Sequence, residues 1–326
     1  MLFTQIWFGL LSKLLSLEFY GWMVCLVWLR FLFCITTLIT VGFVKLNYLT
    51  SEMAAVSVVV PCYRCSNSIE RAVRSIVAQS VPPREVILVD DASGDGTLAT
   101  LHELARLHPK WIKVIELNEN IGAAGARNAG WNVASQPYIA FLDADDTWHL
   151  DKIRIQYQYM RDSPDVAISG HQCIVLRDGE SPLGFIFPPI IIRVTAQSLI
   201  FRNSFSTPTV MLKRNIPLRF SEDKRYCEDF FLWQQIAYSG LLMSRLEAPM
   251  AYVHKALFGE GGLSAQLWKM EKGELDNFAR LYGAGSINRM LFLAASFFSI
   301  SKFCKRVILA LTYKISALLR QGKFFL

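Results

Sequence analysis

The sequence lacks the cysteine pattern of a disulfide scaffold. Its 326 residues include seven cysteines, an odd number scattered without a framework. Such usage suits a reducing compartment, and no disulfide network is implied. Cys62 and Cys65 form a close pair between a predicted strand and a predicted helix. Because that setting is typical of thioredoxin-like redox proteins, a redox enzyme is an alternative interpretation of the chain.

The sequence also lacks the common phosphate-binding glycine motifs. The run GAAGARNAG, residues 122–130, matches neither the dinucleotide fingerprint nor a P-loop. The run DASGDG from Asp91 resembles a calcium loop, but its twelfth position is His102 in place of glutamate, which excludes an EF-hand. Arg127 is the informative residue here, because a guanidinium near a helix start can hold carboxylates or phosphates.

Acidic residues are absent after Asp276, where lysines and arginines alternate with apolar runs. This pattern predicts basic amphipathic helices in the C-terminal region, residues 266–326. We expect them to lie at an anionic membrane surface, with packing against the protein core as the alternative. Leu, Ile and Phe stand where a phosphate-binding arm would be solvated, so nucleic acid is not the expected partner.

Apolar residues gather at the two ends of the chain. Hydrophobic residues make up 52% of the sequence and the mean hydropathy is +0.29, both high for a soluble enzyme. Residues 19–44 contain one charge, Arg30, and are long enough to span a bilayer. Met53 stands just before AAVSVVVPCY, so residues 1–52 are either a hydrophobic anchor or an untranslated stretch upstream of the true start.

From Val56 onward, short β-branched runs alternate with helical stretches, without internal repeats. This alternation predicts an α/β fold, a mostly parallel Rossmann-like sheet flanked by helices, in a domain spanning residues 53–265. Polar segments follow three of the predicted strands, at residues 61–63, 90–93 and 143–146. Because parallel sheets bind ligands at the carboxyl ends of their strands, we expect these segments to meet at one rim.

The pattern weakens after Asp151. KIRIQYQYM predicts a helix, VAISGHQCIVL predicts one or two strands, and SPLGFIFPPI predicts a loop or an edge. Helical periodicity returns in EDFFLWQQIAYSG, where an apolar stripe lies beside Glu228 and Asp229.

Three carboxylates, Asp143, Asp145 and Asp146, stand within four positions after an apolar strand. Like charges so close together repel unless a cation or hydrogen-bond donors lie among them. Oxygen ligands without a neighbouring Cys or His suit Mn²⁺ or Mg²⁺. The alternative is an acidic helix start.

Five segments together, in order and spacing, resemble the inverting family-two glycosyltransferases with a GT-A fold. They are VSVVVPCY, ILVDDAS, GAAGARNAGW, YIAFLDADDTW followed by Lys152 and Gln156, and CEDFFLW. The resemblance covers residues 55–264. It implies transfer of a sugar from a nucleotide-diphospho-sugar donor to an acceptor hydroxyl, with inversion and with Mn²⁺ or Mg²⁺ as cofactor. It further implies surface polysaccharide synthesis, lipopolysaccharide or exopolysaccharide, on a saccharide or lipid-linked acceptor at the cytoplasmic side of the cell membrane.

The resemblance also assigns roles to individual residues. The positions matching the nucleotide and donor pocket are Pro61, Tyr63, Asp91, Arg127 and Asp143. Asp145 matches the cation ligand, with Asp146 in support and His254 as a further metal or phosphate contact. Glu228 and Asp229 match the Glu-Asp pair whose aspartate is the general base. Arg64 departs from the family, which often has Asn there. A non-catalytic nucleotide-sugar-binding or membrane scaffold protein is a third interpretation.

Overall fold

The computed structural model describes residues 53–176, 180, 184, 187–254 and 266–320. The N-terminal hydrophobic segment, with its predicted anchor or late start, lies outside the described residues. Among the helices in those ranges, none is both long enough and apolar enough to cross a membrane.

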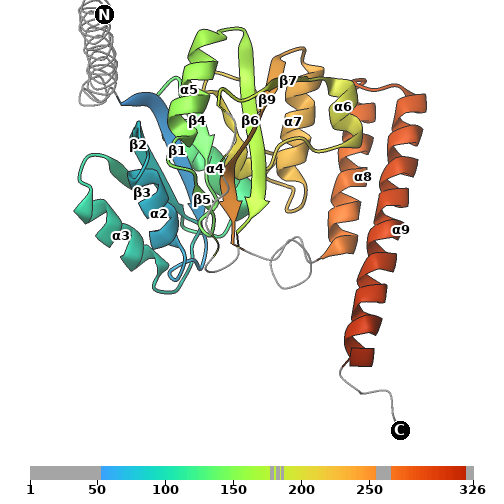
Figure 1. Ribbon diagram of the computed structural model, residues 1–326, viewed down its shortest axis with the longest axis horizontal. Coiled ribbons are helices and arrows are strands. Elements are labelled where there is room, and N and C mark those ends of the chain that lie inside the picture. The colour runs from blue at the N-terminus through green and yellow to red at the C-terminus, as the bar shows by residue number, and fades with distance from the viewer. Residues whose placement is uncertain (1–52, 177–179, 181–183, 185–186, 255–265, 321–326) are drawn as a thin grey trace, which may run out of the picture. The chain divides into compact units, whose positions relative to one another are not determined.

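Half of the sheet is parallel, as the alternating sequence pattern predicts. Its strands are β1 (Ala54–Cys62), β2 (Pro83–Asp90), β3 (Ile112–Glu116) and β4 (Tyr138–Phe141), in the order β3-β2-β1-β4. The helices between them are α2 (Ile69–Val77), α3 (Thr97–Leu107) and α4 (Gly122–Val133). β1 and β2 are buried along most of their length, which explains their β-branched composition. We call these four strands the parallel half (Figure 1).

The other strands form a mixed half. They are β5 (Thr147–Trp148), β6 (Val166–Val175), β7 (Ile191–Val194), β8 (Met211–Lys213) and β9 (Leu242–Val253). β8 pairs antiparallel with both β4 and β6, whereas β6 and β9 are parallel. β5 and β7 each pair antiparallel with β9. The segment predicted as one or two strands is therefore a single strand, β6.

Within the described residues, three α-helices and one 3-10 helix complete this half. They are α5 (Lys152–Asp162), α6 (Ala196–Phe201), the 3-10 helix η1 (Thr207–Thr209) and α7 (Glu228–Tyr238). α5 and α7 confirm the two helices predicted after Asp151.

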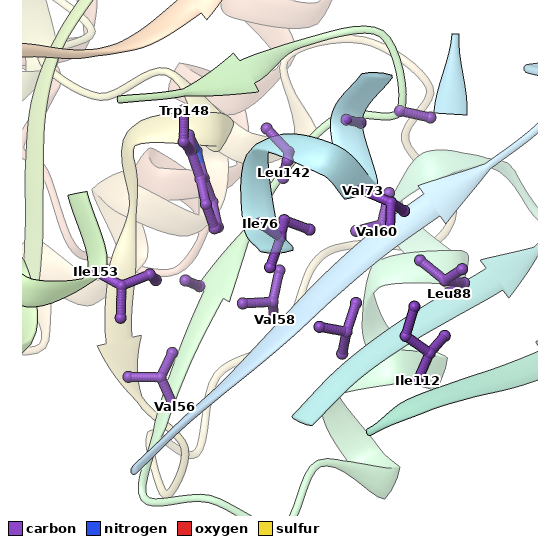
Figure 2. Close-up of a cluster of buried hydrophobic side chains, with 14 of the residues drawn as sticks. Val56, Val58, Val60, Val73, Ile76, Leu88, Ile112, Leu142, Trp148 and Ile153 are labelled. Atoms are coloured by element: carbon purple, nitrogen blue, oxygen red, sulfur yellow. The ribbon is translucent and has the colours of Figure 1, made fainter. Parts of the chain in front are cut away.

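Two hydrophobic clusters sandwich the sheet because side chains alternate between the faces of a strand. Figure 2 shows Val56, Val58 and Val60 of β1 on the same face as Ile76 of α2. Val59, on the opposite face, belongs to the cluster formed with α4 and α7. The sheet is thus covered on both faces, as an α/β fold requires.

The C-terminal region is helical, as predicted. α8 (Leu267–Gly283) and α9 (Arg289–Arg320) lie side by side (Figure 1). One face of α9 packs on the protein: Lys302 Nζ lies 2.8 Å from Glu274 Oε1, and Arg306 Nη2 lies 3.1 Å from Glu271 Oε2. Another face exposes large apolar side chains: Met290, Leu293, Phe297, Ile300 and Ile308. The amphipathic character is confirmed, and attachment to a membrane stays a prediction.

Candidate functional site

The three polar segments meet at the carboxyl rim of the parallel half, as predicted. Cys62 at the end of β1 pairs with Asp90 of β2, and the Asp91 amide donates to the Cys62 carbonyl at 2.8 Å. Val59 pairs with Phe141 of β4, which places the acidic motif directly after the neighbouring strand. Residues far apart in sequence therefore share one edge of the sheet.

Asp91 holds the start of α4. Its carboxylate accepts hydrogen bonds from the amides of Ile121, at 2.8 Å, and Gly122, at 2.9 Å. The Asn120 side-chain amide donates to the Asp91 carbonyl at 3.0 Å. A buried carboxylate at a helix N-terminus is stabilised by such donors. Asp91 therefore fixes the rim loop, and its predicted contact with the donor stays a prediction.

Tyr63 lies at the rim with 46% of its surface exposed, next to the part-buried Pro61. The neighbouring Arg64 has φ +49° and places its guanidinium 5.3 Å from the Tyr63 ring centroid. Its amide donates to Ser93 Oγ at 3.1 Å, and Ala92 beside that serine has φ +50°. Left-handed backbone at non-glycine residues is costly, so two facing loops are held in an uncommon conformation at this rim.

Arg127 of α4 joins the two acidic motifs. Its Nη2 donates to Asp143 Oδ1 at 2.8 Å, and its Nη1 donates to Glu228 Oε1 at 3.0 Å. Only 5% of Arg127 is exposed. Burial opposes its charge, but Asp143, Glu228 and Asp229 together raise its pKa above the ordinary value. One guanidinium thus ties the end of β4 to the start of α7.

Asp229 is a partly buried carboxylate at the first turn of α7. Its Oδ2 accepts from Thr207 Oγ1 at 3.2 Å, and its Oδ1 accepts from the Phe230 amide at 2.6 Å. Burial and the charge of Glu228 raise the pKa of Asp229 to about 6, against the opposing effect of Arg127. A carboxylate with a pKa near neutrality is suited to general base catalysis.

Asp229 opens onto a cavity of about 380 Å³. The other lining residues come from β6, the α6–η1 loop and β9: His171, Gln172, Cys173, Arg202, Asn203, Ser204, Phe205, Ser206 and Arg245. Burial and the charges of Asp146 and Asp143 raise the pKa of Cys173 to about 12. Cys173 of the cavity wall therefore lies within electrostatic reach of the acidic motif, while Asp229 lines the same cavity.

α5 contributes two buried polar residues that contact η1 directly or through Trp148. Lys152 and Gln156 are fully buried, and Lys152 Nζ lies 3.8 Å from the Trp148 ring centroid. Gln156 Nε2 donates to the Thr209 carbonyl at 3.0 Å and so holds η1, whose Thr207 donates to Asp229. Gln156, and Lys152 through Trp148, whose Nε1 donates to the Pro208 carbonyl at 2.7 Å, thus help to hold η1 beside Asp229.

The predicted cation ligands lie close together in the fold. β5 pairs with β9, and Thr147 Oγ1 lies 2.8 Å from His254 Nε2, which brings the histidine beside the acidic motif. Arg71 Nη2 donates to the main-chain carbonyl of Asp145 at 2.8 Å. In the described ranges, no group of three or more His, Cys, Asp or Glu is arranged to hold a metal ion.

This set of donors still fits a divalent cation. Mg²⁺ commonly takes one or two carboxylates from the protein and completes its shell with water and substrate phosphates. Asp145 with Asp146 or Asp143 offers oxygen ligands of that kind at the rim. A cation held here would need further ligands, such as water or phosphate oxygens, to complete its shell.

Cys62 and Cys65 belong to the hydrophobic core. Cys62 is fully buried and Cys65 is 9% exposed. Burial raises the pKa of the Cys62 thiol well above its ordinary value. The hydrogen bond with Cys62 lowers the pKa of the Cys65 thiol, but both cysteines are buried. Because a redox pair must be accessible to its partner, this burial argues against the thioredoxin-like interpretation.

The sequence did not reveal the cavity at Asp229. Its walls come from residues 171–173, 202–206 and 245, which join only because β6 pairs with β9 across some seventy residues of chain. The prediction that Arg127 could hold carboxylates is confirmed, but the sequence did not show that Glu228 is one of its partners.

The chain resembles known glycosyltransferases in sequence. It matches the model of the family described as glycosyl transferase family 2 over residues 57–214. It is 38% identical over 142 residues to the putative teichuronic acid biosynthesis glycosyltransferase TuaG of Bacillus subtilis, covering 43% of this chain and 56% of that protein. It is 30% identical over 182 residues to the UDP-Glc:alpha-D-GlcNAc-diphosphoundecaprenol beta-1,3-glucosyltransferase WfgD of Escherichia coli, covering 56% and 69%. The chain thus spans little more than half of the first relative.

Solved structures share the fold. The mannosyltransferase PcManGT from Pyrobaculum calidifontis, in complex with GDP-Man and Mn²⁺, matches with a TM-score of 0.56 and 19% identity, covering 87% of this chain and 86% of that one. TarS residues 1–349 of S. aureus, in complex with UDP-GlcNAc, match with a TM-score of 0.53 and 21% identity, covering 69% and 66%. The predicted GT-A fold is confirmed.

Proposed function

The chain belongs to glycosyltransferase family 2, and we propose that it transfers a sugar from a nucleoside-diphosphate donor to an acceptor hydroxyl, with inversion at the anomeric carbon. The observation that carries the proposal is the link through Arg127. Asp143 on the donor rim and Glu228 beside Asp229 are held by one buried guanidinium. Asp229 also faces a cavity that can receive the acceptor.

The donor would occupy the rim of the parallel half. Tyr63, with the neighbouring Pro61, offers an exposed ring for a nucleotide base, and Asp91 and Asp143 offer oxygens for ribose or sugar hydroxyls. TarS was solved with UDP-GlcNAc and PcManGT with GDP-Man, both nucleotide sugars. These neighbours support a nucleotide-sugar donor without deciding its base or sugar.

Asp145, with Asp146 and His254 close by, would hold Mn²⁺ or Mg²⁺ against the donor's diphosphate. A bound cation would stabilise the negative charge that develops on the leaving diphosphate. Arg71 fixes the main chain at Asp145, and the pairing of β5 with β9 keeps His254 in reach. PcManGT was solved with Mn²⁺, which supports this assignment.

Asp229 would act on the acceptor. Above pH 6 its carboxylate is ionised and can take the proton from a hydroxyl that lies in the cavity. Thr207 and the Phe230 amide keep the carboxylate oriented. Glu228, paired with Arg127, contributes by raising the pKa of its neighbour. A single displacement of this kind inverts the anomeric configuration.

Surface polysaccharide synthesis is the process we propose. The relatives include proteins named for teichuronic acid, amylovoran and succinoglycan biosynthesis, and WfgD is named for a diphosphoundecaprenol-linked acceptor. We therefore propose a saccharide or lipid-linked saccharide acceptor at the cytoplasmic side of the membrane. The exposed apolar side chains of α9, beginning at Met290, are suited to such a surface.

A panel of nucleotide sugars tests the proposal. The purified chain is incubated with each donor and Mn²⁺ or Mg²⁺, and release of nucleoside diphosphate is measured with and without a chelator. We expect turnover of one donor class, abolished by the chelator. Binding of nucleotide sugars without turnover, in the presence of lipid-linked acceptors, would identify a non-catalytic binding protein instead.

A further inference from the structure

A second cavity, of about 300 Å³, lies between α8 and the loop that leads into α7. Its lining residues are Asp223, Lys224, Arg225, Tyr226, Lys269, Lys272, Gly273, Asp276 and Arg280. Five of these residues are cationic and two are acidic, so the cavity carries a formal charge of +3. We call it the basic cavity. It shares no residue with the cavity at Asp229.

The acidic residues of the basic cavity are already engaged. Asp276 pairs with Lys224 and with Arg280, whose Nε lies 2.9 Å from its Oδ2. Asp223 Oδ2 lies 2.6 Å from Arg280 Nη2. Arg225, Lys269 and Lys272, in contrast, have no acidic partner among the described residues. The three cations that carry the excess charge are therefore open to an anionic ligand.

The cavity walls are closely packed. A Cβ added to Gly273 would lie 2.8 Å from the Tyr226 carbonyl, so glycine allows the loop backbone to touch α8. Lys224 is 6% exposed, and its ammonium donates to the Gly273 carbonyl at 3.3 Å. The basic residues are consequently mounted on two elements held at a fixed separation. The packed backbone fixes the spacing of Arg225 on the loop from Lys269 and Lys272 on α8, whose exposed side chains can meet an anion from both walls of the cavity.

The basic cavity is linked to the donor rim. Arg225 Nη2 donates to Asn120 Oδ1 at 3.2 Å, and Asn120 donates to the Asp91 carbonyl at 3.0 Å. The same loop continues through Cys227 into the start of α7, which carries Asp229. A ligand in the basic cavity would therefore lie beside the reaction centre without occupying it.

The surroundings of the cavity favour a lipid. Trp268 stands one helical turn before Lys272 on α8 and is 59% exposed. Its ring packs 5.6 Å from the Phe303 ring of α9. Exposed tryptophan beside lysine is typical of side chains at a membrane interface, where the ring is partly buried and the ammonium meets headgroups. A soluble phosphate would gain nothing from this tryptophan.

We propose that the basic cavity binds the phosphate group of a lipid. Two lipid sources share this chemistry: the headgroup of an anionic phospholipid, and the diphosphate of a lipid-linked acceptor. In the second case the inference rests on the proposed function, because the diphosphate then belongs to the substrate. In both cases Lys269, Lys272 and Arg225 supply the charge, and Trp268 meets the apolar part.

The experiment compares two double variants of the full chain with the parent protein. Lys269→Gln/Lys272→Gln removes two cations from the basic cavity. Arg84→Gln/Lys110→Gln removes two exposed cations near the amino ends of β2 and β3, at the opposite edge of the sheet, and serves as the control matched in charge. Co-sedimentation is measured with phosphatidylcholine vesicles, with and without phosphatidylglycerol. Calorimetry measures binding of inorganic pyrophosphate in buffer that contains a chelator. The chelator removes divalent cations, so pyrophosphate should not bind at a cation-dependent donor site.

If the cavity binds headgroups, the first variant loses about 30-fold in affinity for phosphatidylglycerol vesicles, about fivefold per lysine, and the control loses much less. If the cavity binds the lipid-linked diphosphate, the first variant loses affinity for inorganic pyrophosphate instead. Equal losses in both variants in both assays would overturn the proposal. Turnover of the donor in the absence of an acceptor, measured with Mn²⁺, should be the same in the first variant and the parent protein. A failure of the lipid-binding proposal can therefore be distinguished from a failure of the proposed transferase function.

Discussion

The parallel half and the mixed half of the sheet contribute different kinds of side chain to the site. In the parallel half, the carboxylate of Asp91 accepts two main-chain hydrogen bonds and that of Asp143 is paired with Arg127. On the mixed side, Asp229 has a raised pKa, and the buried His171 Nε2 has no hydrogen-bond partner in the described structure. The carboxylates of both halves are hydrogen-bonded, but Asp229 is buried beside Glu228, which raises its pKa toward neutrality and suits it to exchange a proton.

Arg127 connects the two halves, because its guanidinium reaches both Asp143 and Glu228. Substitution of Asp229, Arg127 or Asp145 tests the separate roles proposed for the two halves. Substitution of Glu228 tests the cause of the raised pKa of Asp229.

The largest effect is expected for Asp229→Asn. Without the base, kcat should fall by about 10²–10⁴-fold, since this is the usual contribution of general base catalysis. Nucleotide binding, measured by calorimetry, should stay unchanged because Asp229 lies on the acceptor side. Asp162→Asn, at an exposed carboxylate of α5, is the control. Full turnover by Asp229→Asn would show that Asp229 is not the general base.

Arg127→Met should destabilise the fold by about 3 kcal/mol, because it leaves Asp143 and Glu228 without their shared partner. Arg161→Met breaks a pair that is more than half exposed and should change the free energy of unfolding by less than about 0.5 kcal/mol. Urea denaturation measures both values. Equal losses in the two variants would show that Arg127 does not connect the halves energetically.

Asp145→Ala should lower the apparent affinity for Mn²⁺ in the presence of donor by at least about tenfold. Loss of a residue that only orients a metal ligand already costs about tenfold in metal affinity, and loss of the ligand itself should cost at least as much. A titration of activity against Mn²⁺ gives this value. Asp95→Ala, an exposed carboxylate that accepts from the Thr97 amide at 2.9 Å, is the control at the same rim. An unchanged Mn²⁺ titration would show that Asp145 does not hold the cation.

The smallest effect is a shift in pH dependence. If Asp229 acts as an ionised base, kcat should be highest well above pH 6 and fall as the pH is lowered through about 6. Glu228 raises that pKa, and Glu228→Gln should therefore move the acidic limb of the kcat profile to lower pH. Glu70→Gln, at an exposed ion pair on α2, should leave the profile in place. A shift to higher pH would mean that Glu228 acts mainly through Arg127.

The parallel half could be predicted from sequence because its signals are local. β-branched runs such as VSVVV alternate with helical stretches. β1, β2 and β3 pair in chain order, and β4 adds to the free edge of β1. The rim residues follow those strands directly, so Asp91 and Asp143 were placed correctly.

The mixed half could not be predicted in the same way, because its pairing is not local. Val166 of β6 pairs with Leu242 of β9, and Thr147 of β5 pairs with Tyr252. No pattern in the sequence between these partners specifies that they meet. The cavity at Asp229 and the contact between Thr147 and His254 depend on this pairing. Sequence motifs gave Asp229 itself, and the fold supplied its surroundings.

We propose a single displacement by an acceptor hydroxyl that Asp229 deprotonates. Proton NMR of the anomeric signal of the first product, formed from a donor of known configuration, tests this most directly. We expect the inverted configuration, β from an α-linked donor. Product with the retained configuration would contradict it, because retention requires a second displacement or a front-face attack for which Asp229 is not the base.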